Sequence, residues 1–378
     1  MFYGSRFRRG VARRSANRRS QLNPRQIRGA KSERLVLSQE THGPFETYDL
    51  GDFELEEGGA IRGLKLAYAT FGTLSPEKDN AILFPSWYSG SNKIVEQAYV
   101  GPGRALDPSK YFIILVNQIG NGLSSSPSNT PSPFNAASFP RVRIGDDVRA
   151  QHRLIVEKFG IEKLALVLGI SMGAQQTYDW AVRFPDALAR AAPIAGTAKG
   201  TSHNALLVET FIEAITSDPA WDGGWYANQA LVHRGLRRHA RVFATSGFTQ
   251  DLYNLGVYRK LGFSSRDDFL TGFVENAFLP QDPNNLILLL RKWRDFDVSR
   301  LSGGDLKSAL SRIKAKTFVI AIEEDVFFPL KDIAADQKLV PNSELKLLSS
   351  VWGHLALFGV DPFYNERIDA HLKELLSA

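Results

Sequence analysis

The chain has 378 residues, of which 43% are hydrophobic and 23% charged, and its formal net charge is +6. This composition is typical of a globular protein with one large domain or two smaller ones. It contains no cysteine, which excludes disulfides, cysteine-based metal sites and a thiol nucleophile, and no apolar run reaches the roughly 20 residues that cross a bilayer.

The positive charge is concentrated in the first 34 residues. These carry ten Arg and one Lys against a single Glu, a net charge of +10, whereas the rest of the chain carries −4. With few large apolar residues, residues 1–45 are predicted to be a disordered basic leader. No apolar stretch follows the arginines, so the chain is not expected to be secreted. The composition fits an organellar transit peptide, a solvated tail or a nucleic-acid-binding arm, and the expected location is cytoplasmic, or mitochondrial if the leader is a transit peptide.

Short strand-like runs begin after the leader. Residues 46–55 and 61–72 flank a Gly-containing turn and predict an antiparallel pair. Apolar runs typical of strands buried on both faces follow at 80–86, 111–118, 164–170, 189–195, 316–322 and 344–350. Between several of them the apolar spacing is helical, as at 146–159 and 173–184. This alternation predicts an α/β fold with a mostly parallel central sheet and helices on both faces.

Residues 200–305 interrupt this alternation. They contain long helical patterns and aromatic clusters but no obvious buried strand. A segment of this length between two core strands predicts an inserted helical cap, which leaves residues 46–199 and 306–378 as the core. The alternative is an extended helical face of the main domain.

The sequence Gly169-Ile170-Ser171-Met172-Gly173 lies between an apolar strand and a helical pattern. In this context a G-x-S-x-G sequence predicts a sharp turn that exposes the serine hydroxyl, with small residues on either side relieving the crowding. Ser171 is therefore the candidate nucleophile.

A serine nucleophile needs a base, and the base needs an acid to fix its tautomer. In folds with this turn the chain order is serine, acid, histidine. Asp325 follows the strand at 316–322 and is the preferred acid, with Glu323 and Glu324 as rivals. His354 follows the strand at 344–350 and is the candidate base.

The other six histidines have weaker claims to a catalytic role. Those in the cap are candidates for either substrate contact or a structural role: His203, His233 and His239. The remaining three lie in a polar loop or on helix faces: His42, His152 and His371. No pair has the spacing of metal ligands, so no metal is expected.

An acyl-transfer site also needs two backbone N–H groups that hold the developing oxyanion. One is expected from Met172, directly after the nucleophile. The other is expected from the loop after the strand at 80–86, where Tyr88 is preferred and Trp87 is the alternative. Packing at a strand end is the other interpretation of this aromatic pair.

Several motifs together resemble the homoserine acetyltransferase family of α/β-hydrolases. They are the segment 101–107 with Tyr111, Phe112 and Asn117, the stretch 140–153, the turn at Ser171, Asp325 followed by Phe328-Pro329, and Gly353-His354. The resemblance covers residues 46–375. It implies an α/β-hydrolase fold with a helical cap, a triad of Ser171, Asp325 and His354, and Tyr88 at the oxyanion position.

The chain also departs from that family. Ile170 and Ala174 replace two glycines of the family's G-G-S-M-G-G turn, Trp87-Tyr88 replace small residues, and the family's carboxylate-binding arginine has a counterpart only near Arg241. Proteins of the same branch include simple ester hydrolases, and the chain is more similar to these. Trp87 and Arg241 are candidate substrate contacts.

The leading hypothesis is thus a serine hydrolase that cleaves a small acetyl-type ester through an acyl-enzyme and needs no cofactor. The alternative is an O-acetyltransferase with acetyl-CoA as acyl donor. A third hypothesis is a non-catalytic ligand-binding protein with the same fold. The expected partners are a small ester and, as an assembly, a second copy of the chain in a homodimer. Neither nucleic acid nor a membrane is expected, because the body is net acidic and has no spanning segment.

Overall fold

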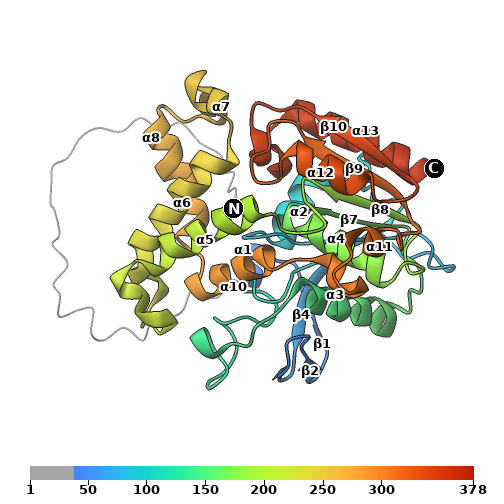
Figure 1. The fold of residues 1–378 in the computed structure, drawn as a ribbon, viewed down its shortest axis with the longest axis horizontal. Helices are drawn as coiled ribbons and strands as arrows, with labels where there is room; N and C mark the ends of the chain where they lie inside the picture. The colour runs from blue at the N-terminus through green and yellow to red at the C-terminus, as the bar shows by residue number, and fades with distance from the viewer. Residues whose placement is uncertain (1–37) are drawn as a thin grey trace.

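A computed structural model describes residues 38–378, and the predictions for residues 1–37 lie outside this part. Its centre is a sheet with the strand order β1-β4-β6-β5-β7-β8-β9-β10 (Figure 1). The strands are β1 (Glu46–Asp49), β4 (Lys65–Phe71), β5 (Ala81–Pro85), β6 (Phe112–Val116), β7 (Leu166–Ile170), β8 (Arg190–Ile194), β9 (Lys316–Ile322) and β10 (Ser343–Leu348). A separate antiparallel pair joins β2 (Phe53–Glu54) to β3 (Ala60–Ile61).

The sheet is parallel from β6 to β10, and β1 and β4 add antiparallel strands at one edge. Every residue of β5, β6 and β7 is buried. Because successive side chains of a strand point to opposite faces, both faces of the sheet are covered. The predicted fold class is therefore confirmed, and each predicted apolar run overlaps a strand. The expected burial on both faces is wrong for β10, of which only Leu348 is buried, because it is the last strand at this edge of the sheet.

Helices of the core pack along these strands. They are α2 (Asn92–Tyr99), α3 (Ile144–Arg153), α4 (Met172–Arg183), α11 (Leu306–Leu310), α12 (Leu330–Gln337) and α13 (Pro362–Ser377). Helix α4 contacts β7 and β8, α12 contacts β9 and β10, and α13 contacts β8, β9 and β10. Helix α3 begins at Ile144 and widens into a π turn, η3 (Leu154–Lys158).

Between β8 and β9 the chain forms a group of helices beside the sheet (Figure 1). They are α5 (Ser202–Thr216), η4 (Pro219–Gly224), η5 (Gln229–Val232), α6 (His233–Gly247), α7 (Gln250–Asn254), η6 (Val257–Leu261), α8 (Arg266–Phe269), η7 (Leu270–Glu275), α9 (Asn276–Phe278), α10 (Pro283–Arg294) and η8 (Val298–Ser302). Helix α5 packs against α6 and α10, whereas η8 already packs against α4 of the core. We refer to residues 200–305 as the cap; the division of the chain into this cap and a core of residues 46–199 and 306–378 stays a prediction.

The expectation of a disordered leader up to residue 45 is wrong at its C-terminal end. Residues 38–45 include α1 (Gln39–His42), and the side chain of His42 is buried. The prediction that His42 lies in a polar loop is therefore also wrong, because His42 is the last residue of α1 and is buried. Among the described residues, no helix combines the length and apolarity needed to cross a membrane.

Candidate active site

Ser171 lies between the end of β7 and the start of α4, in a backbone conformation (φ 56°, ψ −123°) that is strained for a residue with a side chain. The turn closes only because its neighbours are small. A Cβ on Gly169 would overlap the carbonyl of Gly173, and one on Gly196 would lie 2.6 Å from the Ser171 carbonyl oxygen. The Ser171 N–H donates to the carbonyl of Ile194 in β8, which ties the turn to the sheet.

His354 faces this serine from η9 (Gly353–Phe358), which follows β10. Its Nε2 lies 2.9 Å from Ser171 Oγ, and its Nδ1 lies 2.6 Å from Asp325 Oδ2. A carboxylate oxygen can only accept, so Nδ1 carries the proton and Nε2 is left to accept from the serine hydroxyl. All three side chains are buried. The structure therefore brings together the three residues expected from the sequence.

The second carboxylate oxygen of Asp325 is held by the backbone. Oδ1 accepts from the N–H groups of Phe327 at 2.8 Å and Phe328 at 3.2 Å, which aims Oδ2 at the histidine. From the cap, Asn204 Nδ2 donates to the Phe327 carbonyl at 2.5 Å. The acid loop is thus fixed from both the core and the cap.

The two rival carboxylates lie elsewhere. Glu323 is exposed. Glu324 accepts from the Ser350 N–H at 2.8 Å and from the Ser349 hydroxyl, so it joins the loop after β9 to the loop after β10. Asp325 is the one of the three acids that contacts His354.

The loop after β5 lies against the N-terminus of α4. Gln176 Nε2 donates to the Ser86 carbonyl at 2.8 Å, and the Ser86 hydroxyl accepts from the Gln118 N–H at 3.1 Å. Within residues 38–378, no hydrogen-bond acceptor takes the backbone N–H of Tyr88 or of Met172. The same holds for the N–H of Trp87, so these contacts do not separate Tyr88 from Trp87, and the oxyanion role of Tyr88 and Met172 stays a prediction.

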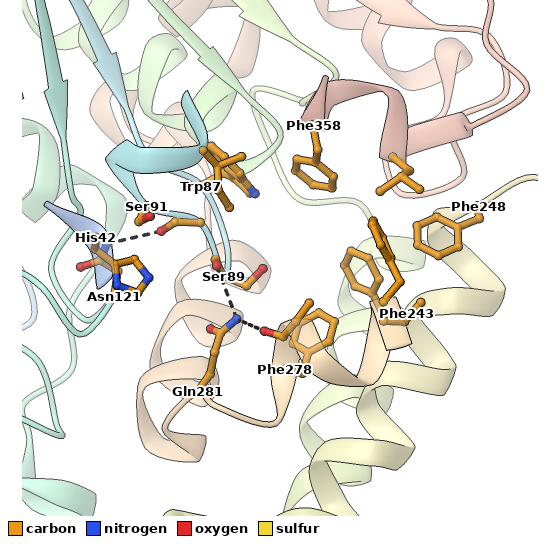
Figure 2. Close-up of a pocket in the computed structure, with 16 residues that line it drawn as sticks. His42, Trp87, Ser89, Ser91, Asn121, Phe243, Phe248, Phe278, Gln281 and Phe358 are labelled. Atoms are coloured by element: carbon orange, nitrogen blue, oxygen red, sulfur yellow. Dashed lines mark hydrogen bonds between the residues drawn. The ribbon is translucent and has the colours of Figure 1, made fainter. Parts of the chain in front are cut away.

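A cavity lies between η9, the loop after β5 and the cap, and Leu355, the residue after His354, is part of its lining. Its wall is mostly apolar and includes the aromatic rings of Trp87, Phe243, Phe248, Phe278 and Phe358 (Figure 2). The Trp87 ring stacks on the Phe358 ring with centroids 5.4 Å apart. Trp87 thus lines this cavity, and its contact with substrate stays a prediction.

The far end of the cavity is polar. His42 of α1 lies there with Ser91 and Asn121 (Figure 2). Burial lowers the pKa of His42 to about 4, so its imidazole is neutral near pH 7. An N-terminal segment thus completes the wall of a cavity made mainly by the core loop and the cap.

Arg241 does not reach this cavity. Its side chain is 63% exposed and lies 3.6 Å from Glu275 Oε1. Phe243 and His239 face inward from α6, and a residue two positions from each on a helix points to the opposite side. The contact between Arg241 and substrate stays a prediction, and the lining of this cavity does not support it.

The sequence alone did not predict the contacts of two buried residues of α6. His239 Nε2 forms a hydrogen bond with the Tyr88 hydroxyl, and Phe243 lines the cavity. The spacing of Leu236, His239 and Phe243 at three and four residues, together with Ala240, indicates one buried face of a helix and could have placed both groups. No comparable pattern marks His42.

Lys292 of α10 is buried beneath the loop that carries Gln118. Its Nζ donates to Gln118 Oε1 and to the Ile119 carbonyl, both at 2.9 Å, and forms an ion pair with Asp147 of α3. Gln118 also contacts the Met172 sulfur. The ion pair of Lys292 and Asp147 therefore joins helix α10 to helix α3 of the core, close to the turn that carries Ser171.

Lys292→Met is expected to destabilise the protein by about 3–5 kcal/mol, because it leaves the Asp147 carboxylate buried without its counter-charge. Urea unfolding measures the change. The control is Lys314→Met at an exposed pair with Asp186, where a loss below about 1 kcal/mol is expected. Equal losses for the two variants would contradict this role of the buried pair.

Comparisons with known proteins agree with this geometry. The pattern of the α/β hydrolase fold family matches residues 82–359. The ethyl acetate hydrolase of Pseudomonas veronii is 53% identical over 90% of this chain and 98% of its own. The crystal structure of an acetylester hydrolase from Corynebacterium glutamicum superposes with a TM-score of 0.89 at 51% identity, covering 90% of this chain and 98% of the other.

A homoserine O-acetyltransferase of Trichormus variabilis is 32% identical over 80% of this chain and 86% of its own length. The resemblance to that family is thereby confirmed, and the chain is more similar to the two ester hydrolases. With a parallel sheet, a strained serine turn and a matching family pattern over most of its length, the chain belongs to the α/β-hydrolase fold family.

Proposed function

We propose that the chain hydrolyses acetyl esters of small alcohols, with Ser171 as nucleophile, His354 as base and Asp325 as the acid that orients the base. The observation that carries the proposal is the line of contacts from Ser171 Oγ to His354 Nε2, at 2.9 Å, and from His354 Nδ1 to Asp325, at 2.6 Å. Ester hydrolysis is also the activity named for the relatives at 53% and 51% identity.

In the first half-reaction, Ser171 Oγ attacks the ester carbonyl while its proton moves to His354 Nε2. The carbonyl oxygen becomes an oxyanion, which the N–H groups of Tyr88 and Met172 hold. The bond to the alcohol then breaks, and the alcohol leaves with the proton from His354. An acetyl group remains on Ser171.

In the second half-reaction, water attacks the acetyl group and gives a proton to His354. The same two N–H groups hold the second oxyanion. Acetate leaves as Ser171 Oγ recovers its proton. The reaction uses the ester, water and the chain's own groups, so it requires neither a metal nor a cofactor.

The cap, residues 200–305 in this proposal, closes the aromatic cavity over the site. The leaving alcohol takes its proton from His354, so it must lie beside that residue. Leu355 and Phe358, on the same turn as His354, line the cavity. We therefore assign the cavity to the alcohol part of the ester. The Phe327 ring packs against the imidazole of His354, with centroids 4.8 Å apart, and lies outside the lining of the cavity. We assign this ring to the acyl side of the site, where it would favour a short acyl group.

Lengthening the alcohol of an acetate ester is expected to raise kcat/KM, because each buried methylene contributes about 0.8 kcal/mol, or roughly fourfold. Lengthening the acyl group of an ethyl ester is expected to lower it. The measurement is kcat/KM for ethyl, butyl and hexyl acetate beside ethyl butyrate and ethyl hexanoate. Ala277→Phe should flatten the alcohol series by filling the cavity, whereas Asn276→Phe adds the same ring on an exposed position.

A labelling experiment tests the assignment of the nucleophile. A fluorophosphonate should inactivate the protein at one equivalent, and peptide mapping should find the label on Ser171. Acetate release from ethyl acetate should fall in proportion to labelling. A label on another residue with the same loss of activity would contradict the proposal.

The location expected from the sequence, cytoplasmic or mitochondrial, remains part of the proposal, as does the homodimer. Fusing residues 1–45 to a reporter tests import. A diffuse reporter would favour the cytoplasm.

A further inference from the structure

Two hydrogen bonds link the loop after β5 to the cap. Gln281 Nε2 donates to the Ser89 carbonyl at 3.5 Å, and the Tyr88 hydroxyl lies 2.9 Å from Nε2 of His239 in α6 (Figure 2 shows the first of them). Tyr88 and His239 are both buried, and His239 has no exposed surface. A contact of this kind joins a residue of the proposed oxyanion hole to a helix of the segment that covers it.

The direction of this hydrogen bond follows from the other side of the imidazole. His239 Nδ1 faces the carbonyl oxygen of Phe211 in α5 at 3.4 Å, and a carbonyl can only accept. The proton therefore lies on Nδ1, and Nε2 accepts from the Tyr88 hydroxyl. Burial lowers the pKa of His239 to about 3 and raises that of Tyr88, so both groups stay neutral near pH 7.

Aromatic rings hold both partners in place. The His239 ring lies between Phe211 and Phe278, with centroids 4.9 Å and 4.6 Å away. The Tyr88 ring packs against Trp293 at 6.0 Å. Such packing leaves neither side chain an aqueous alternative, so removing one partner leaves the other buried without a hydrogen bond.

The two ends of the loop have their own anchors. Ser86 is tied to Gln176 and Gln118, and the Gly90 N–H donates to the Trp87 carbonyl. At Tyr88 itself the backbone N–H is free, and in the part of the chain described here His239 is the one polar partner of the Tyr88 side chain.

On the C-terminal side of Tyr88, Gln281 donates to the Ser89 carbonyl at 3.5 Å and Asn121 to the Gly90 carbonyl at 3.4 Å, both long hydrogen bonds. The Tyr88 side chain supplies the shorter anchor, so the position of the Tyr88 N–H depends on how the side chain is held as well as on these two contacts.

We propose that His239 is a positioning residue, which acts through the Tyr88 hydroxyl to hold the Tyr88 N–H where the oxyanion forms. The cap must then be seated on the core for the oxyanion hole to be complete. This inference rests on the proposed ester hydrolysis and adds a role for a cap residue that does not touch the reacting atoms.

Tyr88→Phe and His239→Leu are each expected to lower kcat for p-nitrophenyl acetate by about 10- to 100-fold while KM changes less than about twofold, since the loss falls on the transition state. The double variant should be no slower than the slower single variant, because both remove one interaction. His239→Gln, which restores an acceptor, should recover part of the rate. Affinity for a boronic acid, which forms a tetrahedral adduct on the serine, should fall in parallel with kcat.

Tyr253→Phe is the matched control. Tyr253 donates its hydroxyl to the Ala244 carbonyl at 2.6 Å, so this variant removes a tyrosine hydroxyl bond inside the cap without touching the loop after β5. Its kcat and boronic acid affinity should match the wild type even where its Tm falls.

Two results would overturn the inference. One is a kcat for Tyr88→Phe within twofold of the wild type with unchanged boronic acid affinity. The other is an equal loss in Tyr253→Phe, which would reduce the effect to cap stability. Absence of ester turnover in the wild type would instead contradict the proposed function, so the two failures are distinguishable.

Discussion

Ser171→Ala is expected to lower kcat/KM for p-nitrophenyl acetate by about 10⁴-fold or more, because no acyl-enzyme forms without the hydroxyl. The remaining rate comes from the free N–H groups and the cavity, which can still orient an ester for attack by water. Steady-state kinetics with the purified variant measures the loss. A rate near that of the wild type would end the assignment of Ser171.

Ser171→Gly provides the control for this result. It removes the same hydroxyl and also relieves the positive φ of 56° at this position. Glycine adopts such a conformation without strain, so the variant should unfold at a higher Tm than Ser171→Ala by an amount worth about 1 kcal/mol or more. Two inactive variants, one of them more stable, would separate lost chemistry from lost folding. Equal Tm values for Ser171→Gly and Ser171→Ala would contradict the claim that the backbone is strained at position 171.

Asp325→Asn is expected to lower kcat by about 10³- to 10⁴-fold with little change in KM. The amide can still accept the two backbone hydrogen bonds from Phe327 and Phe328. An NH₂ group in the place of Oδ2 then faces His354 Nδ1, which favours the tautomer with the proton on Nε2. That histidine cannot accept the Ser171 proton.

Glu323→Gln is the matched control, since it makes the same chemical change at an exposed carboxylate two residues away. Its kcat should stay within about twofold of the wild type. Glu324→Gln should show an intermediate loss, because Glu324 holds the loop that leads to His354 through Ser350. A larger loss at Glu323 or Glu324 than at Asp325 would reassign the acid.

Much of the sheet and the arrangement of the three candidate residues could be predicted from the sequence because their determinants are local. The run 164–170 is apolar at every position but Gly169, and the next residue is the serine of a turn that only small neighbours permit. Asp325 and His354 each follow an apolar strand by a few residues. The carboxyl ends of parallel strands meet at one edge of the sheet, so their proximity to Ser171 follows from topology.

The contacts made by the cap could not be predicted in this way. Arg241 and His239 are two residues apart in α6, and which of them faces the core depends on the rotation of that helix against β5 and its loop. His42 lies in a segment whose composition indicates disorder, yet it is buried against a cavity that forms only after the cap has packed. Such placements depend on tertiary packing, which local patterns do not encode.

The three candidate catalytic residues do not determine which molecule receives the acetyl group. A serine, a histidine and an acid in this geometry lead to an acyl-enzyme whether water or another alcohol receives the acetyl group. Whether water or another alcohol receives the acetyl group depends on the cap and the cavity. In this chain aromatic rings line the cavity, and Arg241 lies outside it with an exposed side chain. We therefore assign the acetyl group to water.

The most direct test is a product analysis with one preparation of the wild-type protein. Ethyl acetate and acetyl-CoA are each supplied as acyl donor, with and without homoserine, and both acetate and O-acetylhomoserine are quantified over time. The proposal predicts acetate from ethyl acetate at a rate that homoserine does not change, with acetyl-CoA a poor donor. O-acetylhomoserine formed faster than acetate from either donor would contradict it.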